Sequence, residues 1–217
     1  MKTFFCFLLI LAFQISAHAT YYLEPSCSYS CTSINGGLYK LDAPYFHRFD
    51  IYEGNSNIRS GYVDKLNERT RTYRLFLRGQ QLSTMYSPFF SLGSLMDSLK
   101  TFEVLDEQDN SIGQIVGKFF TSNPSKFDFY DKQGKYFCTA SLNRAYSQLT
   151  FQNIEGENLV LCNKSFSYKV GGWFEDDGMV TRNYWRIDEV SSSSIDPRFF
   201  WPFLSFIAEV WWSGVTE

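Results

Sequence analysis

Histidine is almost absent from this chain of 217 residues, which contains only His18 and His47. A Ser-His-Asp or Cys-His catalytic arrangement, or a metal site with several histidines, would therefore depend on His47. That residue lies in the strand-like stretch PYFHRFDIY, and no nucleophile-elbow motif accompanies it. We therefore predict no catalytic residue, no metal site and no cofactor.

An excess of basic residues is also missing, since 20 Lys and Arg stand against 23 Asp and Glu, a net charge of −3. This balance gives no basic surface for nucleic acid, which we exclude as a partner. Pro-rich linkers, low-complexity tracts and long charge runs are absent as well. A single domain is the simplest organisation, and we expect a monomer.

Long apolar runs occur only at the two ends of the chain. The first has Lys2 before an apolar run from Phe4 to Phe13, and it ends in the A-x-A triplet Ala17-His18-Ala19. This pattern predicts a secretory signal peptide over residues 1–19, cleaved before Thr20. An uncleaved anchor is the alternative, but the run is too short to span a bilayer. We expect export to the periplasm or the extracellular space, with no transmembrane span in the mature chain.

Four cysteines remain after cleavage, and an oxidising compartment favours disulfides among them. Residues 20–36 are polar and predict an N-terminal arm that contains Cys27 and Cys31. A local Cys27–Cys31 bridge is favoured, and the alternative is an arm stapled to the rest of the protein by one or two bridges. Cys138 and Cys162 are predicted to lie on two strands that flank a third. Because neighbouring strands lie about 4.8 Å apart, these two thiols are too distant to pair.

Aromatic residues, by contrast, make up 19% of the chain, a composition typical of strands. Alternating apolar runs interrupted by Asp, Asn and Gly turns predict consecutive β-hairpins. They cover residues 49–63, 102–120, 127–142, 149–162 and 171–187, and further strands are expected in LYKLD, TYRLFLRG and QLSTMYS. About twelve strands favour a closed antiparallel β-barrel over residues 37–217.

The second apolar run, IDPRFFWPFLSFIAEVWW, predicts a buried helix over residues 198–212. Asp196 and Pro197 are a suitable N-cap and first-turn pair, whereas Pro202 predicts a kink or a later start. Ser205, Glu209 and Ser213 would form a narrow polar stripe. A helix that is apolar on nearly every other side must be surrounded by protein. We therefore expect it to fill the barrel with Phe203, Phe206, Ile207, Val210 and Trp211.

The hairpins FEVLDEQDNSIGQIVGK and FDFYDKQGKYFCTASL, followed by the terminal segment SIDPRFFWPFLSFIAEV, resemble the tubby C-terminal-like superfamily. The nearest branch is that of the LURP-one-related and phospholipid-scramblase-like proteins, and the resemblance covers roughly residues 38–212. It implies a twelve-stranded antiparallel barrel around a central C-terminal helix, together with association with membrane lipids. Most such relatives face the cytosol, in contrast to the export expected here, and no individual functional residue carries over.

The segment KLNERTRTYRLFLRG is the best polar candidate for a binding surface. A basic strand with interleaved aromatics could hold phosphate or lipid headgroups. The candidates are Lys65, Arg69, Arg71, Arg74 and Arg78. The acidic groups at 106–110 and 175–178 are interpreted as hairpin turns rather than calcium sites. We therefore predict an exported, non-enzymatic binding or structural module that contacts membrane lipid headgroups or an envelope or host protein. The alternative is an exported enzyme or a lipid-translocating, scramblase-like protein.

Overall fold

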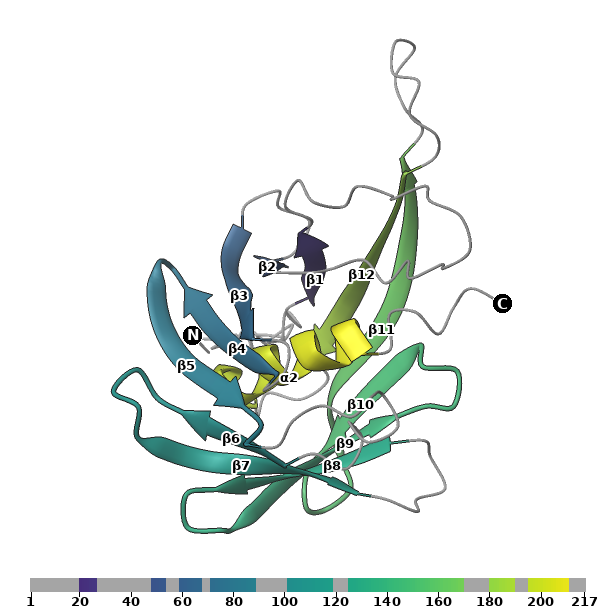
Figure 1. The fold of residues 1–217 in the computed structure, drawn as a ribbon. Helices are drawn as coiled ribbons and strands as arrows, with labels where there is room; N and C mark the ends of the chain where they lie inside the picture. Colours follow the sequence, from purple (N-terminus) through teal and green to yellow (C-terminus); the bar gives the residue numbers. More distant parts are fainter. Residues whose placement is uncertain are drawn as a thin grey trace, which may run out of the picture.

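The protein is a closed β-barrel that surrounds one helix, as a computed structural model shows for residues 20–26, 48–53, 59–67, 71–88, 101–118, 125–169, 180–189 and 195–210 (Figure 1). All twelve neighbouring pairs in the barrel are antiparallel, and the order follows the chain until β12 pairs with β1. The predicted fold class is therefore confirmed. The elements are β1 (Thr20–Ser26), β2 (Arg48–Glu53), β3 (Arg59–Asn67), β4 (Thr72–Leu77), β5 (Gln80–Tyr86), β6 (Thr101–Leu105), β7 (Ser111–Lys118), β8 (Ser125–Asp131), β9 (Tyr136–Leu142), β10 (Gln148–Gln152), β11 (Asn158–Lys169), β12 (Val180–Glu189) and α2 (Pro197–Val210).

Four of the five predicted hairpins are confirmed as β2–β3, β6–β7, β8–β9 and β10–β11. The fifth, at residues 171–187, was wrong in its pairing. β12 begins at Val180 and pairs with β11, which extends to Lys169. The reason is the length of β11. The predicted hairpin 149–162 ended this strand at residue 162, but its 12 residues continue to Lys169. The predicted Asp177-Gly178 turn and the LYKLD strand lie outside the described residues.

The predicted N-terminal arm is also corrected, because its first part belongs to the barrel wall. β1 lies between β12 and β2 and closes the barrel. Its sequence TYYLEPS has a single aliphatic side chain, Leu23, which is completely buried. One inward aliphatic residue is too few to show alternation, and for that reason the strand was missed. Cys27 and Cys31 lie outside the described residues.

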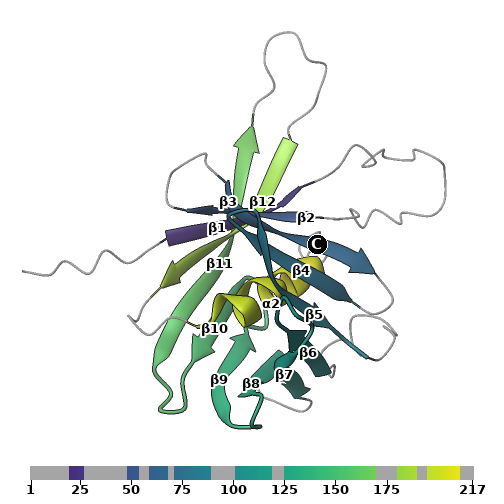
Figure 2. The same ribbon diagram turned by 90° about the vertical axis from the view of Figure 1, so that its left-hand side faces the viewer.

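Alternation along each strand sends one set of side chains into the barrel, where they meet α2. Figure 2 shows the helix passing through the space that the strands enclose. Phe203, Phe206 and Ile207 are completely buried, as predicted. Val210 is the last residue of α2, its side chain is not described, and Trp211 lies beyond the described residues. The core rings Phe102, Phe127, Phe129 and Phe151 come from three strands, β6, β8 and β10, and each packs edge-on or tilted against a ring of the helix.

The start of α2 follows from its sequence. The Asp196 Oδ1 atom accepts a hydrogen bond of 2.9 Å from the backbone N–H of Arg198, and Pro197 takes the first helical position. Pro202 lies inside a continuous helix rather than at its beginning. A proline there lacks the N–H that would bond to the carbonyl of Arg198, four residues earlier. That carbonyl instead accepts a hydrogen bond of 2.9 Å from the Ser83 hydroxyl of β5, so the barrel wall satisfies it.

The strand order around Cys138 and Cys162 is confirmed, since β10 lies between β9 and β11. Both residues are free thiols that are completely buried. Burial raises the pKa of Cys138 to about 12, and it raises the pKa of Cys162 as well. A thiol that stays protonated is a poor nucleophile, so these two cysteines act as small apolar core residues.

Candidate functional site

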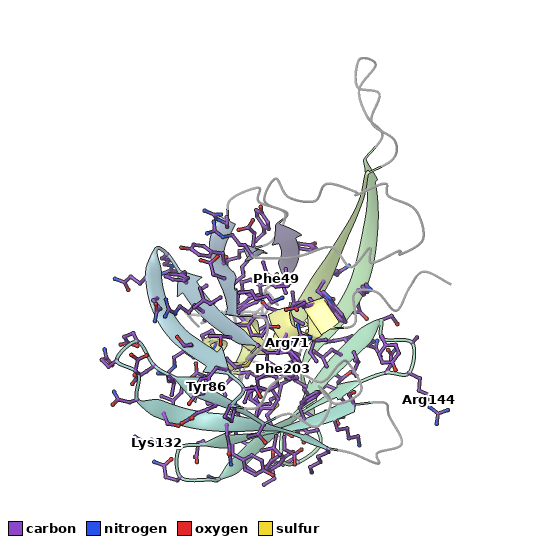
Figure 3. The ribbon with its side chains drawn as sticks, in the orientation of Figure 1. Phe49, Arg71, Tyr86, Lys132, Arg144 and Phe203 are labelled. Atoms are coloured by element: carbon purple, nitrogen blue, oxygen red, sulfur yellow. The ribbon has the colours of Figure 1, made fainter. Side chains whose placement is uncertain are left out.

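The predicted basic surface divides into an inward and an outward group. Lys65 and Arg71 both form ion pairs with Glu209 near the end of α2, at 2.7 Å for the Lys65 Nζ–Glu209 Oε1 pair. The Tyr73 hydroxyl donates to the other carboxylate oxygen at 2.6 Å. The lysine and glutamate side chains are only 5% and 11% exposed. Figure 3 shows Arg71 beside α2, in the same central region as Phe203.

This buried group fixes the C-terminal end of the helix inside the barrel. Cations near the last turn of a helix also complement the negative end of its dipole. Lys65 and Arg71 are therefore committed to the interior, and they are not available to a membrane surface. The sequence signal was Glu209, the one acidic residue in an apolar helix, but its basic partners lie 138 and 144 positions away. No local pattern could identify them.

Arg74 and Arg78 form the outward group, and both are exposed. Neither makes an ion pair or a side-chain hydrogen bond with any residue that the structure describes. Arg74 lies on the outer wall between Asp64 of β3 and Thr84 of β5. Arg78 lies in the β4–β5 turn, where its backbone N–H donates to the Ser60 carbonyl at 3.1 Å. Arg69 lies outside the described residues.

A pocket of about 260 Å³ opens at the end of the barrel where α2 begins. We call it the mouth pocket. Its walls come from β1, β2, β3, β4, β11, β12 and the first turns of α2. The lining residues are Tyr21, Ile51, Glu53, Ser60, Leu77, Arg78, Val160, Ile187, Ile195, Pro197, Phe200 and Trp201.

The lining of the mouth pocket is mainly aliphatic and aromatic, with few polar groups. The Ser60 hydroxyl already donates to the Ile51 carbonyl at 3.2 Å. The Tyr21 ring packs edge-on against Trp201, with ring centres 5.7 Å apart. Glu53 has an interaction of its own, whereas the side chain of Arg78 has none with a described residue. Arg78 is therefore the charged group at this mouth that a ligand could engage most readily.

The start of α2 faces the same pocket through Pro197, Phe200 and Trp201. Asp196 accepts hydrogen bonds from the first N–H groups of the helix. The N–H of Arg198 donates to its carboxylate, and the N–H of Phe199 donates to its backbone carbonyl. The helix therefore offers no free donor to a ligand. It contributes only the positive end of its dipole, which favours negative charge near the mouth.

The outer wall carries a second polar group around Asp128, which sequence reasoning missed. Its carboxylate is buried, accepts a hydrogen bond of 2.6 Å from the Thr139 hydroxyl and pairs with Lys118. This contact with Asp128 raises the pKa of Lys118, and burial raises the pKa of Tyr130 nearby. Since the carboxylate is fully engaged, the group ties β7, β8 and β9 together.

A third polar group, on β2 and β3, is likewise satisfied internally. The guanidinium carbons of Arg48 and Arg59 lie 4.3 and 5.2 Å from the centre of the Tyr62 ring. Each also pairs with an aspartate, Arg48 with Asp64 at 2.8 Å and Arg59 with Asp50 at 3.0 Å. Each of these two arginines thus has an acidic partner, so this part of β2 and β3 carries no excess of positive charge.

The acidic segment 106–110 is a hairpin turn, as predicted. Asp106 Oδ1 accepts backbone hydrogen bonds of 2.9 Å from Gln108 and from Asn110, and the bond from Asn110 lowers the pKa of this carboxyl. Within the described ranges, no group of three His, Cys, Asp or Glu side chains could hold a metal ion. Residues 175–178 and His47 lie outside those ranges.

Among the residues that the structure describes, no helix has the length and apolarity needed to cross a membrane. Comparisons with family models, curated proteins and solved structures find no match to this chain. The architecture agrees with the one that the resemblance to the tubby C-terminal-like superfamily implies. Membership of that superfamily stays a prediction.

Proposed function

We propose that this is an exported, non-enzymatic binding protein that holds a small, mainly apolar ligand in the mouth pocket. The observation that carries the proposal is the pocket itself, which strands from both ends of the chain and the start of α2 build together. Ligand sites are concave, mostly apolar and common in the mouths of β-barrels. The predicted export fits, because β1 begins at Thr20 and removal of residues 1–19 would leave each of the described strands intact.

The size of the pocket sets the size of the ligand. A water molecule takes about 30 Å³ of liquid, so 260 Å³ corresponds to about nine waters, or a ligand of about ten non-hydrogen atoms. An alkyl chain of about eight carbons would gain about 6 kcal/mol from burial. The cost of association, about 4 kcal/mol or more, takes most of this gain, so weak binding with a dissociation constant in the millimolar range or above is expected.

This proposal narrows the predicted role in lipid binding. With Lys65 and Arg71 held by Glu209, the predicted five-residue surface offers far less positive charge to a membrane. The apolar pocket supplies the burial that a lipid-like molecule needs, and Arg78 at its edge supplies one cation.

Isothermal titration calorimetry with 1-octanol tests the proposal. We expect saturable binding with a negative heat-capacity change, because apolar surface is buried. Leu77→Trp should abolish binding, since a larger ring at this lining position fills the pocket. Leu82→Trp is the matched control, because Leu82 is half-buried in the neighbouring strand and does not line the pocket. Equal binding by the two variants, or no binding by the unaltered protein, would refute the proposal.

A further inference from the structure

We propose that the ligand of the mouth pocket is an amphiphilic anion, whose apolar chain lies among the lining residues and whose acidic end is held by Arg78. The chemical class is a medium-chain carboxylate or phosphate monoester. This inference rests on the proposed function, to which it adds the charge of the ligand and the residue that recognises it.

The position of Arg78 is the first observation. It lines the pocket, it is exposed, and no described residue pairs with it. The bond from its backbone N–H to the Ser60 carbonyl fixes the start of the side chain at the edge of the pocket. A guanidinium carries a forked set of donors that matches the oxygens of a carboxylate or a phosphate.

The backbone of Arg78 is the second, independent observation. Its φ of +50° and the φ of +81° at Gly79 define a two-residue hairpin turn with both central residues in the left-handed region. Such turns strongly prefer Asn, Asp or Gly at the first of these positions, because other side chains are strained there. Arginine occupies a position where a smaller residue would be more stable. Strain of this kind is typical of residues retained for a function.

The other charges at the mouth are consistent with an anion. Among the described residues, Glu53 is the one acidic residue of the lining, and it has an interaction of its own, whereas the Arg78 side chain has none with a described residue. Asp196, at the start of α2, is paired with Arg198 at 2.7 Å. The positive end of the α2 dipole points to the same place. If Glu53 dominated instead, the pocket would select a cation, and the experiment below separates the two cases.

The experiment is a titration of three octyl compounds that differ in charge: octanoate, 1-octanol and octylammonium. We expect the unaltered protein to bind octanoate about tenfold more tightly than 1-octanol, and octylammonium more weakly than both. Arg78→Gln should bind octanoate and 1-octanol equally, while its affinity for 1-octanol stays unchanged. Arg74→Gln is the matched control, since this arginine is also exposed and unpaired among the described residues but lies outside the pocket lining. It should keep the tenfold preference.

The outcomes separate this inference from the proposed function. Tightest binding of octylammonium, with loss in Glu53→Gln, would overturn the anion assignment and leave the pocket standing. The same would follow if octanoate and 1-octanol bound equally to the unaltered protein. Binding of none of the three compounds would refute the proposed function itself.

A further arm identifies the source of the anion. Octanoate represents a free acid, and vesicles of dioleoylphosphatidylglycerol present the same anionic chemistry as a lipid headgroup. If the protein binds octanoate or the vesicles, and this binding is lost in Arg78→Gln but kept in Arg74→Gln, the result supports Arg78 as the anion-binding residue. The probe that binds then identifies the source of the anion. Binding to both that is insensitive to Arg78→Gln would overturn it.

Discussion

Replacement of Phe206 by alanine should destabilise the protein by about 3–5 kcal/mol, the range for deleting a buried phenylalanine. The side chain is completely buried in α2, and its ring contacts rings from both the barrel and the helix. The centre-to-centre distances are 4.6 Å to Phe102, 6.1 Å to Phe127, 6.1 Å to Phe203 and 6.4 Å to Tyr73. Because aromatic pairs stabilise beyond their buried area, we expect the upper part of that range.

Urea denaturation followed by circular dichroism measures this loss, and the melting temperature should fall by about 6–20 °C. Phe206→Asp should not fold at all, because a buried, unpaired carboxylate costs several kcal/mol more against a total stability of about 5–15 kcal/mol. Ile154→Ala is the control: this residue is 64% exposed, and the change should cost less than about 0.5 kcal/mol. A loss below 1 kcal/mol in Phe206→Ala, or a soluble and cooperatively folding Phe206→Asp protein, would refute a central helix.

Three further predictions concern the interior. Glu209→Gln removes the carboxylate that the buried Lys65 and the partly buried Arg71 share, and it should cost about 3 kcal/mol in urea denaturation. A loss below 1 kcal/mol would contradict this. Burial raises the pKa of Cys138 and Cys162 above the usual 9.0, so above about pH 9 only the unfolded thiols ionise and the free energy of unfolding should fall with rising pH. This fall should shrink when both cysteines are replaced by alanine. An unchanged fall would show that the two thiols do not cause it. Gly113→Ala should lower the melting temperature, because its new Cβ would lie 2.1 Å from the Tyr130 carbonyl; an unchanged melting temperature would show that the backbone yields freely.

Much of the barrel could be predicted because its strands carry a strong two-residue period. The pair Phe127 and Phe129, for example, marks the inner face of β8 without any knowledge of its neighbours. The helix was predictable for a similar reason, since a segment that is apolar on nearly every side must be surrounded. β1 could not be predicted in this way, because its place in the barrel depends on pairing with β2 and β12 rather than on its own composition.

The site was far less predictable, because it depends on contacts between distant residues. The local pattern placed Lys65 and Arg71 in one basic surface with Arg74 and Arg78, yet Glu209 draws the first two inward from the other end of the chain. The mouth pocket joins residues from Tyr21 to Trp201, and no stretch of sequence contains it. The sequence pattern placed Arg78 on a basic strand, whereas the structure places it in the β4–β5 turn, where it is one of the residues that line the pocket.

A crystal structure of the protein grown with octanoate is the most direct test of ligand binding at the barrel mouth. We predict density for the alkyl chain between Ile51, Ile187 and Trp201, with the carboxylate within hydrogen-bond distance of the Arg78 guanidinium. An empty pocket at saturating octanoate, or octanoate bound only elsewhere on the protein, would contradict the proposed site.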